Sequence, residues 1–417
     1  MTNEISKSQR EFLDWEFGVF FHFGIRTYYE GHTDWDMEQM DPSVFNPKCL
    51  DCEQWIRTVK KAGARYAILV CKHHDGFANW PSKYTDYSVA NTPWKNGKGD
   101  VVAEFVAACR KYDMKIGFYY SPAQFGASSQ NNGEFDGEKY CTYFINQISE
   151  LLTNYGKIDY IWFDGCGSEG VEYDKNRIVD AIRSLQPEIL IFNMWDPDTR
   201  WVGNELGYAP WPNYNYVTKL NFSILANKLD DVTIGGQNPF LPAECDFKLR
   251  QKNWFHSKYD EYTRKSLDEL LGIYYYSVGR GANFLINIGP DEGGVLPQSD
   301  CDLLLQFGDE IRRRFANPIE PESIVRDGNT VKVRFKDKEV INTVVMMEDL
   351  GIKDVVGNYT ISISTGGYNQ IIDLYYGKTI GHKAICEFPH VCADEFIISL
   401  DKPASNIIDL KFYNTAK

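Results

Sequence analysis

The sequence contains little that suits a membrane or a nucleic acid. Its first residues, Met1–Asp14, are polar and charged, so neither a secretory signal peptide nor a membrane anchor is indicated. Lysine and arginine number 44 against 58 acidic residues, which gives a formal net charge of −14. Such a chain has no basic stripe to displace phosphate counterions. The composition therefore argues against a nucleic-acid partner and favours a neutral substrate.

The ten cysteines show neither a metal-type pattern nor a recognisable disulfide framework. Cys49 and Cys52 have C-x-x-C spacing, but no second pair and no thioredoxin-like setting accompanies them. We therefore expect reduced cysteines and a cytoplasmic protein. Removal of a leader peptide would leave the same sequence and make the protein a secreted one.

The first three quarters of the chain alternate between strand-like and helix-like segments. Apolar runs such as Arg65–Cys71 and Lys115–Tyr120 are separated by amphipathic stretches such as Asp100–Tyr112. This alternation predicts a parallel sheet with right-handed crossovers. No glycine-rich phosphate turn follows the first strand candidate, Phe17–Phe23. We therefore expect an irregular (β/α)8-like TIM barrel over residues 1–318 and not an open doubly wound sheet.

After Asn317 and Pro318 the pattern changes to short alternating runs separated by turn residues. The strand candidates are Val331–Phe335, Val340–Met347, Tyr359–Ser364, Gln370–Leu374, Ala384–Phe388 and Glu395–Leu400. Runs of this kind are typical of an antiparallel β-sandwich, which we place at residues 319–417. Its expected role is to support the barrel; a second sugar-binding site is the less favoured alternative.

The most informative segment is Lys157–Gly165, which is expected to be a β-strand ending in a carboxylate. Alternation places Ile161 and Phe163 on one face, and Trp162 with Asp164 on the other. An indole can stack on the C–H surface of a sugar, and a neighbouring carboxylate can act as nucleophile or base. Taken alone, the same Asp could equally cap a helix or begin a turn.

Polar or aromatic groups end four consecutive predicted strands. The residues concerned are His22 after the first, His73 and His74 after the second, Tyr119 and Tyr120 in the third, and Trp162 with Asp164 in the fourth. The chemistry of a barrel lies at the carboxyl ends of its strands. A lone histidine there is usually structural, but three of only seven histidines at two such ends favour a ligand-binding role.

The cluster His73-His74-Asp75 also permits a metal site, which we weigh as an alternative. Neighbouring residues on a strand point to opposite faces, so adjacent histidines rarely share one ion. The H-x-H spacing of barrel metallohydrolases is absent. Neutral imidazoles that bind sugar hydroxyls are favoured instead.

Hydrolysis of a glycosidic bond requires a second carboxyl group. One candidate is Glu205, which stands in Thr199–Gly207 between an aromatic and two glycines. Another is Glu244, with Asp246 close to it in the sequence. Nearby aromatics would desolvate either glutamate and raise its pKa toward that of a general acid. These arguments do not choose between Glu205 and Glu244.

Taken together, these motifs resemble the α-L-fucosidases of glycoside hydrolase family 29. The HHDGF and WFDG motifs are specific as a pair, and the resemblance extends across the whole barrel. The matching segments are Phe20–Gly24, Thr33–Trp35, Lys72–Phe77, Tyr119–Pro122, Trp162–Gly165, Arg200–Glu205, Trp254–His256, Ser277–Arg280 and Asn287–Pro290.

The resemblance implies a retaining exo-α-L-fucosidase with a fucosylated glycan as substrate, no metal or other cofactor, and a C-terminal β-sandwich. It assigns the nucleophile to Asp164 and the acid/base to Glu205, with Glu244 as the alternative. The implied fucose-binding residues are His22, His73, His74, Tyr119 or Tyr120, and Trp162.

Two further segments complete the implied binding site. The family often has Glu-Trp where this chain has Asp34 and Trp35, so a hydroxyl contact is expected to shift there. Trp35 or Trp254 would shelter the apolar C6 methyl group of fucose. The resemblance also points to the branch that acts on α1,3/1,4-linked fucose. The remaining rivals are a catalytically silent fucose-binding barrel and a metal-dependent barrel hydrolase.

Overall fold

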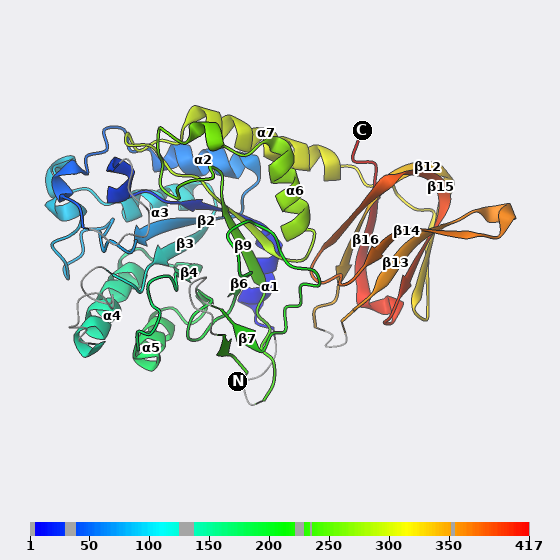
Figure 1. Cartoon of the computed structure of the whole chain (residues 1–417), viewed down its shortest axis with the longest axis horizontal. Helices are drawn as coiled ribbons and strands as arrows, with labels where there is room; N and C mark the ends of the chain where they lie inside the picture. Colours follow the sequence, from blue (N-terminus) through cyan, green and yellow to red (C-terminus); the bar gives the residue numbers. More distant parts are fainter. Residues whose placement is uncertain are drawn as a thin grey trace.

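The computed structural model of the chain describes residues 5–29, 39–124, 137–221, 229–233, 236–351 and 355–416. A larger helix-covered barrel and a smaller body made of strands lie beside each other along the long axis (Figure 1). Within the described part of the chain, no helix has the length and apolar content needed to cross a bilayer. All ten cysteines are free.

Eight parallel strands form the barrel, in the order β5-β4-β3-β2-β1-β10-β9-β6. A backbone bridge between Phe192 and Thr199 joins the two outer strands and closes the wall. The predicted (β/α)8-like barrel is thereby confirmed. Its strands are β1 (Phe17–Phe21), β2 (Tyr66–Lys72), β3 (Lys115–Tyr120), β4 (Tyr160–Phe163), β5 (Leu190–Phe192), β6 (Arg200–Trp201), β9 (Ala243–Lys248) and β10 (Asn283–Asn287).

Helices cover the outside of this wall, each with an apolar face turned toward the strands. In α2 (Cys52–Ala62), for example, Trp55, Ile56 and Val59 are fully buried, and the side chain of Asp51 caps the first turn. The covering helices are α2 (Cys52–Ala62), α3 (Val101–Lys111), α4 (Gly137–Asn154), α5 (Lys175–Leu185), α6 (Leu267–Ser277) and α7 (Gln298–Phe315).

The barrel is irregular between β5 and β9, as expected. Residues 193–199 connect β5 to β6 without a helix, and the described residues between β6 and β9 contain only the short strands β7 (Lys219–Leu220) and β8 (Asp230–Asp231). Short 3-10 helices occupy several loops: η1 (Ile25–Tyr28), η2 (Pro42–Val44), η3 (Val89–Asn91), η4 (Trp94–Gly97) and η6 (Glu261–Thr263).

An N-terminal helix, α1 (Lys7–Trp15), seals the amino end of the barrel. A capping box between Ser6 and Gln9 starts it. Its Phe12 ring packs 6.0 Å from the Tyr66 ring and 5.4 Å from the Tyr160 ring, measured between centroids. These aromatics fill the lower interior, so among the described residues the carboxyl end of the barrel is the end left for a ligand.

The smaller body is the predicted antiparallel β-sandwich, built on six strands and a core of its own. Two predicted pairs of runs are each one long strand, β12 and β15, whose register shifts bend the sheet over itself. The strands are β11 (Ser323–Asp327), β12 (Thr330–Glu348), β13 (Tyr359–Ser364), β14 (Ile371–Gly377), β15 (Ala384–Leu400) and β16 (Ile407–Tyr413), with η7 (Gly366–Tyr368) and η8 (Ala404–Asn406) in turns.

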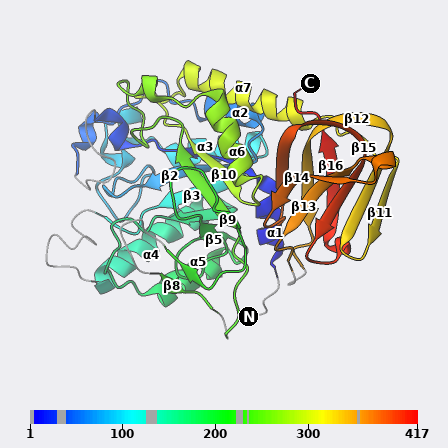
Figure 2. The same cartoon turned by 45° about the vertical axis from the view of Figure 1, so that its right-hand side comes forward.

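Figure 2 shows the sandwich on the side of the barrel where α1 and α6 lie, with α7 running above toward it. Residue 318, where the sequence predicts the domain boundary, falls between the end of α7 at Phe315 and the start of β11 at Ser323. The division into two domains at that residue stays a prediction.

Candidate active site

The carboxyl ends of β1 to β4 bring the predicted polar residues together. Alternation along β4 is as expected, because Ile161 and Phe163 pack on the helix side whereas Tyr160 and Trp162 face the barrel interior. Asp164 follows the last residue of this strand and faces the same way as Trp162, where its carboxylate contacts residues from β2 and β3.

Asp164 is held by three groups and keeps 26% of its side chain exposed. Its Oδ1 accepts the backbone N–H of Cys166 at 2.8 Å, and its Oδ2 accepts the Tyr119 hydroxyl at 2.8 Å. The Nε2 atom of His74 lies 3.4 Å from Oδ2. A carboxylate that is oriented on one side and exposed on the other suits an attacking group.

The protons on His74 follow from its neighbours. The hydroxyl of Ser121 donates to the carbonyl of Ala123 at 2.8 Å, so its oxygen accepts at the 2.5 Å contact with His74 Nδ1. Nδ1 therefore points its proton at Ser121, and Nε2 is the ring nitrogen that faces Asp164.

Burial shifts the pKa values of the titratable groups in this site in different ways. It opposes ionisation of Asp164, but the charge and hydrogen bond of His74, together with the bonds from Cys166 and Tyr119, hold the pKa of Asp164 below its usual range. Burial lowers the pKa of His22 to about 3 and that of His73 well below normal. The site thus presents one ionised carboxylate beside two neutral imidazoles.

Aromatic rings form the wall below Asp164. The ring of Tyr119 stacks on Trp162 with 5.5 Å between centroids, and Trp162 stacks on Phe192 at 4.0 Å. On its other side Tyr119 stacks on His73 at 5.6 Å. This continuous ring surface is suited to the apolar face of a small ring-shaped ligand.

His22 is oriented by Asn287, a residue that we did not predict as part of the site. The Asn287 amide donates to the Trp254 carbonyl at 2.6 Å, so its oxygen faces the Nδ1 atom of His22 at 2.7 Å. The neutral imidazole then keeps Nε2 as an acceptor. Asn287 ends β10, beside β1, and its position at a strand end is the signal that would have identified it.

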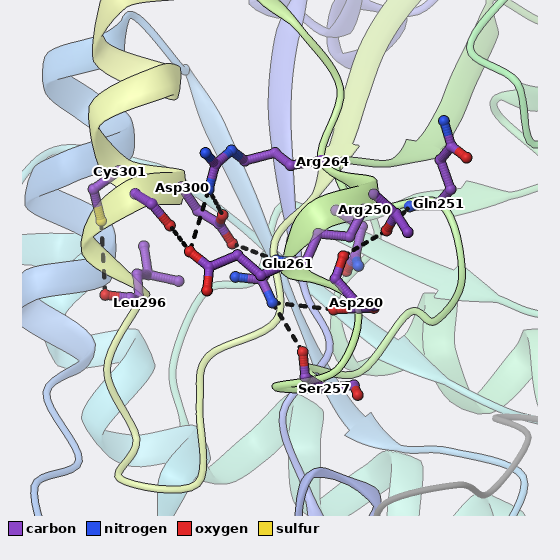
Figure 3. Close-up of polar contacts among 12 residues, drawn as sticks. Arg250, Gln251, Ser257, Asp260, Glu261, Arg264, Leu296, Asp300 and Cys301 are labelled. Carbon is purple, nitrogen blue, oxygen red and sulfur yellow. Dashed lines mark hydrogen bonds and ion pairs between the residues drawn. The ribbon is translucent and has the colours of Figure 1, made fainter.

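The loop that carries Trp254 is fixed by a buried ion-pair cluster (Figure 3). Arg250 donates to Asp300 at 3.0 Å, to Asp260 at 3.1 Å and to the Ser257 carbonyl at 3.0 Å. These contacts tie both ends of the loop to the first turn of α7. Trp254 is thereby placed against His22, with 5.0 Å between ring centroids.

The structure does not place Tyr120 in this site, which corrects the prediction for that residue. Its hydroxyl donates to Gln147 of α4 at 2.7 Å, and its ring packs in the core between strands and helices. Adjacent residues on a strand point to opposite faces, and Tyr119 takes the interior position.

The three residues of the His73-His74-Asp75 cluster point to different partners. Asp75 forms a buried ion pair with Arg26 at 3.2 Å, whereas His74 contacts Ser121 and Asp164. Among the described residues no group of three His, Cys, Asp or Glu side chains is arranged to hold a metal ion. The alternative of a shared ion at this cluster therefore has no geometric support.

Glu205 lies in a half-exposed turn after β6. Asn204 builds this turn by accepting the backbone N–H of Leu206 at 3.0 Å and donating to the carbonyl of Tyr208 at 2.9 Å. Burial, followed by the charges of Asp164, Glu169 and Glu205, raises the pKa of the Cys166 thiol to about 12. Cys166 thus lies within electrostatic reach of both Glu205 and Asp164.

Glu244 lies inside the barrel and is surrounded by donors. Its carboxylate accepts the hydroxyl of Tyr66 at 2.5 Å, the hydroxyl of Tyr160 at 3.2 Å and the indole N–H of Trp162 at 2.8 Å. Only 1% of the residue is exposed, and burial raises its pKa to about 7. A carboxyl group enclosed in this way supports the aromatic wall and is remote from solvent.

We expect replacement of Glu244 by Gln to change the pH dependence of stability. Between the ordinary pKa of 4.5 and the folded value of about 7, the native state holds a proton that the unfolded state releases, so wild-type stability falls as pH rises. Gln does not titrate. Relative to wild type, the variant should gain up to roughly 3 kcal/mol of unfolding free energy across that window.

Denaturant unfolding of both proteins at about pH 4.5 and about pH 7.5 measures this difference. The buried histidines remain in both proteins, so their opposite pH dependence cancels in the comparison. A stability difference that is the same at both pH values would contradict the expectation.

Asp34 and Trp35 lie outside the described residues. Of the other predicted site residues, the structure brings together His22, His73, His74, Tyr119, Trp162, Trp254 and Asp164. Glu205 lies in the turn after β6.

Comparison with known proteins agrees with this arrangement. The family model described as Alpha-L-fucosidase matches residues 2–313. A putative α-L-fucosidase 1 of Oryza sativa subsp. japonica is 37% identical over 434 residues, covering 93% of this chain and 81% of that protein. Alpha-L-fucosidase 1 of Arabidopsis thaliana is 30% identical, covering 91% of this chain and 81% of that protein.

Solved structures agree as well. A putative α-L-fucosidase from Bacteroides thetaiotaomicron superimposes with a TM-score of 0.88 at 29% identity, covering 99% of this chain and 97% of that one. Since the family match spans the barrel and the relatives also cover most of the sandwich, the chain belongs to the α-L-fucosidases of glycoside hydrolase family 29 and is a glycoside hydrolase acting on α-L-fucosides.

Proposed function

We propose that this α-L-fucosidase is a retaining exo-enzyme in which Asp164 is the nucleophile and Glu205 the general acid/base. An Asp164 oxygen forms a bond to the anomeric carbon while the bond from that carbon to the leaving oxygen breaks, and Glu205 gives that oxygen its proton. Glu205 then takes a proton from water, whose oxygen displaces Asp164 and releases fucose. The proton from Glu205 leaves with the aglycone and water replaces it, so Glu205 ends the cycle protonated and Asp164 ionised, as they began.

The observation that carries this proposal is the environment of Asp164. A nucleophilic carboxylate must be ionised and oriented before substrate arrives. The Nε2 atom of His74, the Tyr119 hydroxyl and the Cys166 N–H all face this carboxylate and meet both needs, and they come from three different strand ends. Glu205 is favoured over Glu244 because all the contacts of Glu244 are with donors inside the barrel.

The other groups suit the recognition of fucose. His73 has its Nδ1 atom buried with no hydrogen-bond partner among the described residues, and a sugar hydroxyl would provide one. His22 offers a neutral acceptor nitrogen. The rings of Trp162 and Trp254 would cover the apolar ring face and the C6 methyl group.

Trapping with a 2-fluoro fucoside tests the proposed mechanism. We expect an intact-mass increase equal to one fluorofucosyl group, and peptide mapping should place it on Asp164. The first-formed fucose should also have the same anomeric configuration as the substrate. A label on another residue, or an inverted product, would contradict the mechanism. A catalytically silent fucose-binding protein would give neither label nor product.

We further propose a preference for α1,3/1,4-linked fucose on branched glycans, supported by the Gly-Asn-Glu205 segment. The test compares kcat/KM on a fucosylated trisaccharide carrying that linkage with kcat/KM on an α1,2-linked trisaccharide. Faster hydrolysis of the α1,2 linkage would overturn the preference and leave the proposed mechanism intact.

A further inference from the structure

A groove of about 660 Å³ lies where the barrel meets the sandwich. From the barrel it is lined by Trp211 and by α6 with the turn that follows it, and from the sandwich by β13, β14 and β15. Figure 2 shows α6 and β14 facing each other across this junction. Its volume falls in the range of small-molecule sites in proteins.

Large aromatic side chains stand exposed in this groove. Trp211 is 39% exposed, Tyr276 is 50% exposed and Tyr376 is 66% exposed. A fourth ring, Tyr375, lies 6.2 Å from Trp211 between centroids, with the two planes inclined at 47°. Single exposed aromatics scattered over a surface are normal and indicate nothing. Several exposed rings gathered in one groove indicate an interaction site.

Arg280 holds a planar donor group among these rings. Its guanidinium carbon lies 4.4 Å from the ring centroid of Tyr276 and 5.5 Å from that of Trp211. A hydrogen bond to the Ala209 carbonyl at 2.5 Å anchors one of its nitrogens. Asn213 donates to the carbonyl of Arg280 at 3.0 Å and fixes the backbone as well. The donor is thus set in place before a ligand arrives.

A glycine keeps the groove open. Gly272 lies in the interior of α6, where glycine is less favourable than alanine because it loses more backbone freedom on folding. A Cβ atom built on it would meet nothing within 4 Å and would point into open space. The helix accepts the cost without any backbone conformation that requires glycine, since no positive φ is found there.

The chemistry of the lining selects the ligand. The charged side chains are two acids, Asp268 and Glu387, and two bases, Arg280 and Arg314, so the groove favours neither an anion nor a cation. Exposed ring faces suit the C–H surfaces of sugar rings, and fixed polar groups suit hydroxyls. We propose that this groove is a second, non-catalytic binding site for a neutral oligosaccharide.

The groove is distant from the catalytic centre. Arg280 lies just before β10 begins, at the amino end of the barrel wall, whereas Asp164 follows the carboxyl end of β4. A strand of about five residues separates these two ends by roughly 17 Å. A glycan held here is therefore not the one being cleaved, and the site would retain the enzyme on a substrate that carries many chains.

Calorimetry on the Asp164→Asn protein tests the proposal without interference from turnover. The probe is a fucosylated trisaccharide, and the expected result is two binding events per chain, one in the barrel mouth and one in the groove. Combining Trp211→Ala with Tyr376→Ala should weaken the second event at least about tenfold. Gly272→Gln should do the same by filling the groove while improving the helix.

Matched controls separate these effects from damage to the fold. Tyr368 is an 85% exposed tyrosine of η7, in the turn between β13 and β14, and Tyr368→Ala should change nothing. In the background with Asp164 intact, every groove variant should hydrolyse an aryl fucoside within about twofold of wild type.

A single binding event, or a second event that survives all groove variants, would overturn the proposal. So would a dimer that dissociates when Trp211 and Tyr376 are replaced, because the groove would then be a protein interface. Binding is measured apart from hydrolysis. Failure of the groove therefore leaves the proposed active site untouched, and the reverse also holds.

Discussion

Replacement of Asp164 by Asn should remove hydrolysis of an aryl fucoside while the protein still folds and binds fucose. Asn keeps the volume; its single amide oxygen can accept the Cys166 N–H and its NH2 group can donate to the Tyr119 hydroxyl oxygen, but it has no anionic oxygen to attack the anomeric carbon. Loss of a nucleophile lowers kcat by roughly three to six orders of magnitude in enzymes of comparable design.

The measurement is kcat and KM on the aryl fucoside, with fucose binding followed by calorimetry and folding by thermal unfolding. Asp174→Asn is the matched control, since it makes the same chemical change at the exposed N-cap of α5, where Asn caps as well as Asp. That control should keep full activity. If Asp164→Asn retained more than about one hundredth of wild-type kcat, another residue would have to be the nucleophile.

Replacement of Glu205 by Ala should slow hydrolysis in a way that depends on the leaving group. A fucosylated glycan leaves as a poor alkoxide and needs the proton of the acid, so its kcat/KM should fall by about two to four orders of magnitude. An aryl fucoside with an acidic phenol leaves without that proton, and its first step should be little changed. The fucosyl-enzyme should then accumulate because water is no longer activated.

Added azide should relieve this block, since it needs no general base, and should yield a fucosyl azide of retained configuration. Glu244→Gln is the matched comparison. Its carboxyl group bonds Tyr66, Tyr160 and Trp162 inside the barrel, so we expect less than about a tenfold change with no dependence on the leaving group. The reverse pattern, with azide acting on a Glu244 variant, would exchange the two assignments.

The first four strands and the helices around them were predictable from the sequence because their periodicity is unambiguous. β1 to β4 are apolar runs buried on both faces, and α2, α3 and α5 carry acidic N-caps before amphipathic stretches. The resulting strand ends locate His22, His73, His74 and Asp164. Their placement needs only the rule that chemistry gathers at one end of a barrel.

β9 escaped prediction because its interior face is charged. Glu244, Asp246 and Lys248 point inward, whereas Ala243, Cys245 and Phe247 pack outward, so the run reads as a polar loop. Asp246 is nevertheless buried and bonded to Trp201 at 2.7 Å, and burial, with the charge of Glu205 next, raises its pKa well above normal. Only the pairing of this segment with β10 and β6 in the barrel shows that it is a strand.

Contacts between distant segments were also beyond prediction. Tyr119 and Tyr120 are neighbouring residues of the same type, and the choice between them as the site residue depends on which face of β3 turns toward the barrel interior. Trp211, Tyr276 and Tyr376 come from a loop, a helix and a strand, and no spacing links them. The sequence of the sandwich alone gives too few aromatics to indicate a groove, since the other rings belong to the barrel.

The sealed base of the barrel determines how ligands pass through the reaction. Because α1 and the rings of Phe12, Tyr66 and Tyr160 fill the lower interior, the described residues leave the carboxyl end of the barrel as the route for ligands. In the proposed retaining mechanism, the aglycone leaves through that end before the hydrolytic water enters, and fucose leaves by the same route before the next glycan can approach. Free fucose would therefore compete with incoming substrate for the same entrance and act as a product inhibitor.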